Sequence, residues 1–314
     1  MSREPEQARS GLAVVVVSYA SHQLLADNLA RTARSADLVV VVDNRTDDAE
    51  RAAVRGLAGT RGWHVVEPAD NLGFGAGMNA GVARALELGA TELLLLNPDA
   101  WMAPDGVAGL HAAVREEPWA LVVPRIERPD GTVWASGITD LYLRDGTMHA
   151  RRRRPPGMVV GRDVEEWVSG ACVALSSMLW DKIGGFDSSY FLYWEDVDLS
   201  RRARDAGGRL VVLDDVVAVH DEGGTHRDAR RGPAKSATYY RYSVRNRMLY
   251  ARRWLAPEGV RRWRRASLRA AWKVLLQGGR RQILTVRPVV AVSRGLVEGL
   301  LVRAPARPPG RTGG

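Results

Sequence analysis

Short apolar runs alternate with longer segments of helical periodicity between residues 12 and 123 of the chain. The apolar runs are typical of buried strands and occupy residues 12–18, 38–42, 63–67, 92–96 and 119–123. The segments between them have the period of a helix and occupy residues 21–34, 47–57, 75–88 and 104–117. Strands connected through helices form right-handed crossovers, so the pattern predicts an α/β domain with a mainly parallel central sheet flanked by helices.

The middle of the chain is less regular. Residues 125–166 are polar and contain the arginine run 151–154, and we interpret them as a long surface excursion with solvated arginines. The elements expected after it are strands at residues 167–176, 209–213 and 216–220 and helices at residues 177–183 and 195–206. These elements extend the predicted α/β domain over residues 11–230.

The net charge of +9 is distributed unevenly along the chain. Residues 1–230 carry 25 Lys and Arg against 34 Asp and Glu, whereas residues 231–314 carry 20 against 2. Residues 231–303 have helical periodicity, and Pro257 and Gly278-Gly279 divide them into three expected helices. The sequence therefore predicts a basic helical C-terminal region, with residues 1–10 and 304–314 disordered.

Cysteine usage and apolar runs bear on the compartment. The single cysteine, Cys172, excludes an internal disulfide and fits a reducing cytoplasm. No signal peptide is recognised, and the most apolar stretch, residues 283–302, is interrupted by Arg287, Arg294 and Glu298. We expect a cytoplasmic protein. Its basic tail fits two interpretations: a peripheral surface on the inner face of the plasma membrane, or a helical cap with solvated arginines.

Polar residues directly follow three of the predicted strands, as Ser18-Tyr19, Asp43-Asn44 and Asn97-Pro98-Asp99. Ligands of open parallel sheets bind beyond the carboxyl ends of the strands. Asp43 could accept the imide N–H of uracil or thymine or bind a ribose hydroxyl, or it could cap a helix. Asp99 could hold Mg²⁺ or Mn²⁺ beside phosphates, because such cations prefer oxygen ligands, or it could cap the next helix.

A glycine-rich segment, residues 71–81, opens the helix expected at residues 75–88. Its exposed backbone N–H groups and the helix dipole could attract a diphosphate. The dinucleotide-binding fingerprint places such a turn after the first strand, whereas this one follows the third apolar run. The position argues against a simple Rossmann dehydrogenase.

Three carboxylates, Glu195, Asp196 and Asp198, crowd the start of the helix expected at residues 195–206. Carboxylates so close together repel one another, which raises the pKa of some of them. One could act as general base on an acceptor hydroxyl, and Trp194 could stack on a sugar ring. The alternative is an exposed acidic helix start with a tryptophan in the core.

His220 ends a predicted strand and is followed by Asp221, Glu222 and His226. It could ligate the same metal as Asp99, although a lone histidine is more often structural.

Together these residues resemble the inverting glycosyltransferases of family 2, which have the GT-A fold, and within them the rhamnosyltransferase-like and galactofuranosyltransferase-like branch. The matching words keep the family's order and span residues 12–226. They are Val17-Ser18-Tyr19, Val42-Asp43-Asn44, Asn71-Leu72-Gly73-Phe74-Gly75, Asn97-Pro98-Asp99, Gly184-Gly185-Phe186-Asp187, residues 191–199 and His220. The resemblance implies a GT-A catalytic domain over residues 11–230.

The resemblance also implies roles for the matching residues. Asp43 would bind the donor base, and Asp99 with His220 would hold Mg²⁺ or Mn²⁺ on the donor diphosphate. Asp196 would be the catalytic base, with Glu195 beside it in the acceptor site. The other implied site residues are Ser18, Tyr19, Asn71, Gly73 and Asn79 for the donor, and Tyr193 and Trp194 for the acceptor.

The chain departs from the family pattern in two places. The usual two-carboxylate metal motif is reduced to Asn97-Pro98-Asp99. Processive synthases carry a Gln-x-x-Arg-Trp word and membrane helices, whereas here Tyr250 stands in the place of the Gln before Arg253-Trp254. The resemblance therefore implies transfer of one sugar and not polymer synthesis.

The expected function is transfer of one sugar, rhamnose or another hexose, from a dTDP- or UDP-sugar. The acceptor would be a hydroxyl of a saccharide or of a polyprenyl-diphosphate-linked glycan, as in cell-wall or polysaccharide biosynthesis. One alternative is a non-enzymatic binder that uses the basic tail on membranes or nucleic acid, although no nucleic-acid motif is recognised and no nucleic acid is expected. Another is a sugar nucleotidyltransferase, which would need an Arg- and Lys-containing glycine loop where residues 18–21 stand.

Overall fold

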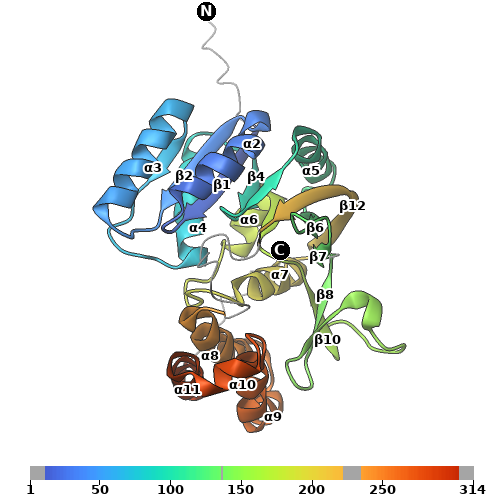
Figure 1. The fold of residues 1–314 in the computed structure, drawn as a ribbon. Helices are drawn as coiled ribbons and strands as arrows, with labels where there is room; N and C mark the ends of the chain where they lie inside the picture. The colour runs from blue at the N-terminus through green and yellow to red at the C-terminus, as the bar shows by residue number, and fades with distance from the viewer. Residues whose placement is uncertain (1–10, 136, 222–234, 304–314) are drawn as a thin grey trace, which may run out of the picture. The chain divides into compact units, whose positions relative to one another are not determined.

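The computed structural model describes residues 11–135, 137–221 and 235–303 (Figure 1). The described chain divides into two compact units. The first unit contains residues 11–138, 167–186 and 199–221, and the second contains residues 139–166, 187–198 and 235–303. The terminal segments expected to be disordered, 1–10 and 304–314, and His226 lie outside the described residues.

The first unit is built on a nine-stranded sheet with the order β3-β2-β1-β4-β11-β6-β12-β5, with β7 paired to β6. Its strands are β1 Leu12–Ser18, β2 Leu38–Asp43, β3 His64–Val66, β4 Glu92–Leu96, β5 Ala100–Met102, β6 Ala120–Glu127, β7 Val133–Ala135, β11 Cys172–Ser176 and β12 Arg209–His220. Strands β3, β2, β1 and β4 are parallel, as are β6 and β12, whereas β11 runs antiparallel to β4 and β6. The predicted mainly parallel α/β sheet is confirmed.

Helices cover both faces of this sheet. They are α1 His22–Leu24, η1 Leu25–Leu29, α2 Ala30–Thr32, η2 Ala33–Ser35, α3 Asp48–Arg61, α4 Phe74–Glu87, α5 Pro104–Glu116 and α6 Ser177–Ile183. Strand β1 shows why its apolar run is continuous: Val15 and Val17 pack in the core beneath α4 and α6, and Val14 and Val16 in the core beneath α3 and α5. A strand covered on both faces has no solvent side and needs no polar alternation.

Two glycines let α4 lie directly on the sheet. A Cβ on Gly81 would fall 2.5 Å from Cγ1 of Val15 and 2.8 Å from Cγ2 of Val42, and one on Gly77 would fall 3.2 Å from Cγ1 of Val17. The valines cannot move aside easily, because β-branched side chains in a buried strand have restricted χ1 angles. The close approach gives these glycines a packing role, independent of any phosphate.

We therefore expect Gly81→Ala to lower the free energy of unfolding by about 1–3 kcal/mol, as overpacking of a dense core does. Gly56→Ala in α3 is the matched control, because its Cβ would meet no atom within 4 Å. It should stabilise by about 0.5–1 kcal/mol, since alanine loses less backbone entropy in a helix. Urea unfolding of both variants measures the two changes. An unchanged free energy of unfolding in Gly81→Ala would contradict the packing role.

The excursion expected at residues 125–166 contains more order than predicted. Strand β6 continues to Glu127, β7 follows it, and the second unit has a three-stranded sheet, order β10-β8-β9. Its strands are β8 Thr139–Tyr142, β9 Met148–Ala150 and β10 Val164–Trp167. Arg154, expected to be solvated, pairs with the fully buried Asp140 at 2.5 Å and with Glu166 at 2.5 Å. Short strands that are held together by a buried ion pair show little apolar periodicity. The hydrophobic pattern of the sequence therefore did not predict them.

Two other expectations are corrected. The strand expected over residues 167–176 is two strands, because β10 ends at Trp167 and β11 begins at Cys172. The two strands expected at residues 209–213 and 216–220 are one strand, β12, whose register against β6 shifts between Leu213 and Val217. Such a bulge interrupts the alternation of a strand without ending its pairing.

The second unit has four α-helices in its C-terminal part where three were expected. They are α8 Ala237–Trp254, α9 Pro257–Arg265, α10 Ser267–Leu276 and α11 Val286–Leu301. Helices α8, α10 and α11 enclose a core of their own that contains the fully buried Tyr240. Trp263 of α9 is also fully buried. In the part of the chain that the structure describes, no helix combines the length and apolarity needed to cross a bilayer.

Candidate active site

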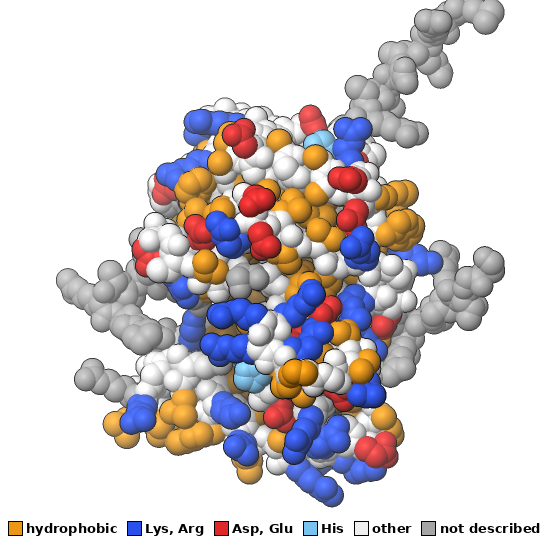
Figure 2. All heavy atoms as spheres, turned by 90° about the vertical axis from the view of Figure 1, so that its right-hand side faces the viewer, with side chains coloured by type: hydrophobic (Ala, Val, Ile, Leu, Met, Phe, Trp, Pro, Cys, Tyr) orange, Lys and Arg blue, Asp and Glu red, His pale blue; other side chains and the backbone are white. Residues whose placement is uncertain are grey.

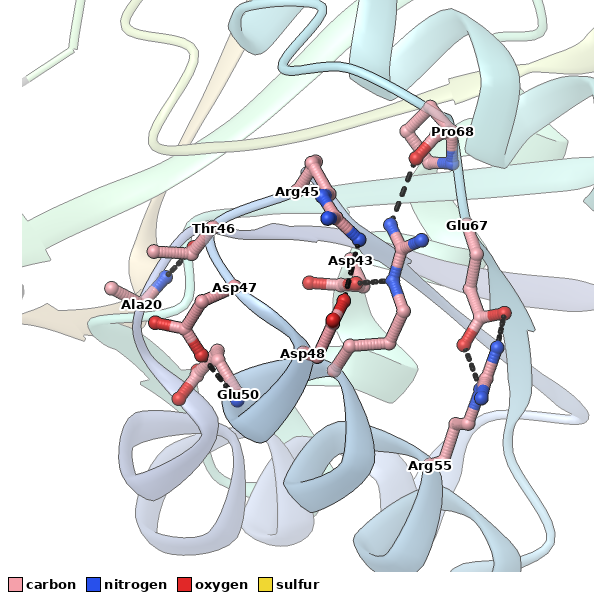
Figure 3. A network of polar contacts seen from close by, with 11 residues as sticks. Ala20, Asp43, Arg45, Thr46, Asp47, Asp48, Glu50, Arg55, Glu67 and Pro68 are labelled. Carbon is pink, nitrogen blue, oxygen red and sulfur yellow. Dashed lines mark hydrogen bonds and ion pairs between the residues drawn. The ribbon is translucent and has the colours of Figure 1, made fainter.

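The carboxyl ends of β1 and β2 place Ser18 beside Asp43, which are paired across the two strands. Asp43 is fully buried, and its Oδ2 accepts a hydrogen bond from Nε of Arg51 at 2.5 Å. Arg51 also donates to the carbonyl of Pro68 at 2.8 Å, which fixes the guanidinium (Figure 3). Oδ1 of Asp43 is buried without a hydrogen-bond partner among the described residues. A buried acceptor without a partner is costly and marks a place for a ligand donor.

The turns that follow these two strands are strained. Ala20 and Arg45 have positive φ angles of 50° and 42°, which side-chain-bearing residues rarely adopt. A hydrogen bond of 3.1 Å from the Ala20 amide to Oγ1 of Thr46 joins the two turns (Figure 3). Tyr19 lies between the strand and Ala20 and is 42 % exposed. Strain of this kind gathers at binding sites, where the surrounding structure enforces it.

The glycine-rich segment is anchored to the same edge of the sheet. Asn44 accepts from the amide of Leu72 at 2.9 Å and donates to the carbonyl of Gly73 at 3.0 Å. Asn71 accepts from the Gly73 amide at 2.8 Å, and Gly73 has φ 79° at the N-terminus of α4. The structure thus brings Asn71 and Gly73 to the strand end that carries Asp43.

Asn79 has a different environment. Its amide oxygen accepts from the Phe186 amide at 2.8 Å and its amide nitrogen donates to the Phe186 carbonyl at 2.8 Å. A Cβ on Gly185 would fall 2.7 Å from the same oxygen. The observed contacts of Asn79 therefore tie α4 to the Gly185-Phe186 turn.

Asp99 and His220 meet although they are 121 positions apart in the sequence. The pairing of β5 with β12 sets His220 opposite Ala100, and Nε2 of His220 lies 3.0 Å from Oδ1 of Asp99. Both residues are buried, and Nδ1 of His220 has no hydrogen-bond partner among the described residues. Helix α5 begins at Pro104 behind Ala103, so the alternative of Asp99 as a helix cap is excluded.

Asp99 and His220 supply one carboxylate oxygen and one imidazole nitrogen. Among the described residues, no three His, Cys, Asp or Glu side chains gather into a cluster that could hold a metal ion. Two protein ligands suit Mg²⁺ or Mn²⁺ at a nucleotide site, because such ions keep waters and substrate phosphates as their other ligands. The donor set fits a metal shared with a diphosphate.

The acidic segment belongs to the second unit and begins helix α7, Glu195–Asp205. Two successive residues before it, Tyr193 and Trp194, have φ angles of 67° and 76°. The fully buried Asn246 of α8 donates to the carbonyls of Leu192 at 2.9 Å and Tyr193 at 2.8 Å. These hydrogen bonds offset the strain of the turn and fix the backbone from which Glu195 and Asp196 project.

Glu195 is buried, and its Oε2 has no hydrogen-bond partner among the described residues. Burial raises the pKa of the Glu195 carboxyl well above its ordinary value, and the neighbouring charge of Asp196 raises it further. Asp196 is less buried and accepts from the Val197 amide at 2.9 Å. The carboxyl of Glu195 is therefore harder to ionise than an exposed carboxyl.

Helix α8 supplies residues that the sequence patterns did not assign to the site. Arg253 pairs with Asp187, and its Nε lies 3.5 Å from Oδ1 of the fully buried Asp198. Nε1 of Trp254 donates to the same Asp198 oxygen at 2.8 Å. The Arg253-Trp254 pair, noted in the sequence as an incomplete synthase word, was the one available signal.

The family described as "Glycosyltransferase like family 2" matches residues 8–248. The chain belongs to this family and is a glycosyltransferase, which excludes the non-enzymatic binder as its function. It is 28 % identical over 248 residues to N-acetylglucosaminyl-diphospho-decaprenol L-rhamnosyltransferase of Mycobacterium tuberculosis, covering 69 % of this chain and 78 % of the relative. It is 24 % identical over 215 residues to the low-salt glycan biosynthesis hexosyltransferase Agl10 of Haloferax volcanii, covering 67 % of each chain.

Solved structures share the fold. The mannosyltransferase PcManGT from Pyrobaculum calidifontis, in complex with GDP-Man and Mn²⁺, superposes with a TM-score of 0.53 at 18 % identity. That superposition covers 95 % of this chain and 88 % of the mannosyltransferase. GalNAc-T7 with UDP, GalNAc and Mn²⁺ gives a TM-score of 0.53 at 14 % identity, covering 84 % of this chain and 55 % of its own. The fold is GT-A, and the rhamnosyltransferase-like branch is confirmed.

Proposed function

We propose that this glycosyltransferase moves one sugar, with inversion, from a dTDP- or UDP-sugar to a hydroxyl of a saccharide or polyprenyl-diphosphate-linked acceptor. Rhamnose is the first candidate and another hexose the second, as the mycobacterial and haloarchaeal relatives are named for these transfers. An acceptor of this class would place the enzyme at the cytoplasmic face of the plasma membrane, in cell-wall or polysaccharide synthesis.

The observation that carries the donor assignment is the buried Oδ1 of Asp43 at the carboxyl end of β2, for which the described part of the chain supplies no hydrogen-bond partner. Uracil and thymine offer an imide N–H that a carboxylate accepts, whereas an unprotonated cytosine offers no such proton. Ser18 and Tyr19 would line the same pocket, with Asn71 and Gly73 close to the diphosphate.

Asp99 and His220 would hold Mg²⁺ or Mn²⁺. The metal would neutralise charge on the departing nucleoside diphosphate. The protein ligands would be the carboxylate of Asp99 and the imidazole of His220, which lie 3.0 Å apart.

Asp196 would take the proton of the acceptor hydroxyl as that oxygen attacks the anomeric carbon from the side opposite the diphosphate. One displacement inverts that carbon. The ring of Trp194 packs against Tyr250 and Trp263, so Tyr193, which is half-buried, is the better surface for the acceptor sugar. Glu195, whose pKa is raised by burial, would lie beside the base in the acceptor site.

The proposed function is tested by measuring binding and turnover for a panel of nucleotide sugars with and without Mn²⁺. dTDP- and UDP-sugars should raise the melting temperature, and GDP- and CMP-sugars should not. Transfer to a polyprenyl-diphosphate-linked saccharide, with inversion seen by NMR, would complete the assignment. Preference for a cytosine nucleotide would overturn the role given to Asp43, and preference for a guanine nucleotide would overturn the choice of donor base.

Asp43→Asn is expected to weaken dTDP- or UDP-sugar binding by about 10–100-fold, the value of a hydrogen bond to a charged acceptor. Asn keeps the shape of the side chain but removes the negative charge that pairs with Arg51 and would accept the N–H of the base. Isothermal titration measures the change. Asp48→Asn is the matched control, because Asp48 is 89 % exposed and pairs with Arg45 at the surface; it should bind the donor as the unaltered protein does.

A further inference from the structure

Helix α11 packs with its smallest residues inward. Ala291, Gly295 and Gly299 are buried against α8. A Cβ on Gly295 would overlap the main-chain carbonyl group of Arg241, and one on Gly299 would fall 3.2 Å from Cα of Arg245. The close approach of the two helices is therefore achieved without using the larger aliphatic residues of α11.

Those larger residues lie on the solvent side of the helix. Their exposed fractions are 78 % for Val286, 38 % for Val289, 57 % for Val290, 56 % for Val297 and 74 % for Leu301. Positions 286, 290, 297 and 301, with Ser293 between them, recur at intervals of three or four and so share one face. A surface helix of a globular protein normally buries such residues, and an exposed apolar stripe indicates a partner.

The apolar surface continues onto α10. Leu268 is 73 % exposed and Trp272, one turn further on, is 50 % exposed. An open groove of about 500 Å³ is lined by Leu268 together with Leu296 and Leu300 of α11. The α10–α11 face is defined here by residues Leu268, Trp272, Val286, Val289, Val290, Val297 and Leu301.

Arginines border this face on both sides. Arg261, Arg264 and Arg265 line the same groove as Leu268. Arg294, which pairs with Glu298 at 2.9 Å, lines a second groove on α11 with Glu298, Val290 and Val297. Helices α9 to α11, residues 257–301, contain ten Lys and Arg against two Glu, so the border is strongly basic. Figure 2 shows exposed hydrophobic side chains lying among Lys and Arg side chains on one face of the molecule.

We propose that the α10–α11 face docks on the surface of an anionic lipid bilayer. The apolar stripe would enter the headgroup and acyl boundary while the bordering arginines pair with lipid phosphates. Trp272 suits this boundary, because its ring is apolar and its N–H remains polar. The helix lies on the membrane and does not span it.

Other occupants fit less well. The segments outside the described residues, 1–10, 222–234 and 304–314, contain no Val, Leu, Ile, Phe, Tyr or Trp that could cover the face. A second copy of the chain would bring the same arginines against one another in a two-fold contact, which like charges oppose. An anionic lipid surface complements both the apolar stripe and its basic border.

The test is flotation of the full chain with vesicles of phosphatidylcholine alone or mixed with phosphatidylglycerol. The protein should float with the mixed vesicles, less at high salt, and not with phosphatidylcholine alone. The double variant Val290→Ser/Val297→Ser should weaken binding about tenfold or more, since several buried methyl groups are lost. Arg264→Gln should weaken it about fivefold, the effect of one cation near an anionic surface.

Val159→Ser/Met178→Ser is the matched control, because these residues are 47 % and 53 % exposed and lie outside the α10–α11 face. It should float as the unaltered protein does. Donor binding and the melting temperature are measured for every variant, so a failed nucleotide assignment is distinguishable from a failed membrane surface. The proposal is overturned if the unaltered protein ignores anionic vesicles, or if Val290→Ser/Val297→Ser converts a dimer into a monomer without changing flotation.

Discussion

Replacing Asp196 by Asn is expected to lower kcat for sugar transfer by about 10²–10⁴-fold, the contribution of a well-placed general base. The Asn oxygen can still accept from the Val197 amide, so the start of α7 should keep its shape. An amide cannot take the proton of the acceptor hydroxyl, and only the chemical step should suffer. Single-turnover transfer, alongside calorimetric titration of the donor, measures kcat and donor affinity separately.

The environment of Glu195 bears on our proposal that its neighbour Asp196, and not Glu195, is the base. Burial and the adjacent charge hold the pKa of Glu195 well above its ordinary value. A carboxyl whose folded pKa is raised stabilises the fold below its unfolded pKa, and this contribution is lost as the pH rises through the folded pKa. Above that pH, the buried Glu195 destabilises the fold relative to an exposed carboxyl. Such a cost in stability is typical of functional sites.

Asp205→Asn is the control for Asp196→Asn, because Asp205 ends the same helix, is 48 % exposed and pairs with Arg201 at 3.0 Å. Its turnover should stay within about twofold of the unaltered enzyme, as expected for a surface pair. Turnover of Asp196→Asn close to that of Asp205→Asn would remove Asp196 from the mechanism. Weakened donor binding in Asp196→Asn would indicate a structural role instead.

The strands of the donor half could be predicted because their signal is local. Strand β1 is apolar throughout, since its two faces are covered by different helices. Helix α3 begins behind Asp47, whose side chain accepts from the Glu50 amide at 2.9 Å, and α5 begins at Pro104. Caps and continuous apolar runs are properties of neighbouring residues, so sequence alone locates them.

The rest depends on pairings that sequence does not contain. Strand β5, three residues long, exists because β12 pairs with it, and that pairing brings His220 to Asp99. Nothing in the local sequence distinguishes Arg154 from its exposed neighbours, because its role comes from the ion pair with the buried Asp140. Likewise, nothing local distinguishes Asn246 from a surface residue, although it is fully buried and holds the Tyr193 turn. Long-range contacts gave these polar residues their roles.

The buried ion pairs between Arg253 and two carboxylates at the acidic segment are further long-range contacts of this kind. Arg253 is 7 % exposed, and it faces Asp187 and the fully buried Asp198. Trp254 adds a hydrogen bond to Asp198, so the end of α8 holds both carboxylates. Two carboxylates out of water are tolerated only while their cation stays in place, because each would otherwise be desolvated without compensation.

Arg253→Ala is therefore expected to lower the free energy of unfolding by about 3–5 kcal/mol, the cost of leaving buried charges unpaired. Arg253→Lys should recover part of this loss, since it restores the charge but not the planar fork. Arg261→Ala is the control, because its partner Glu258 is 69 % exposed and such a pair contributes about 0–1 kcal/mol. Urea unfolding of the three variants compares them. A loss for Arg253→Ala no larger than that for Arg261→Ala would show that α8 does not hold the acidic segment.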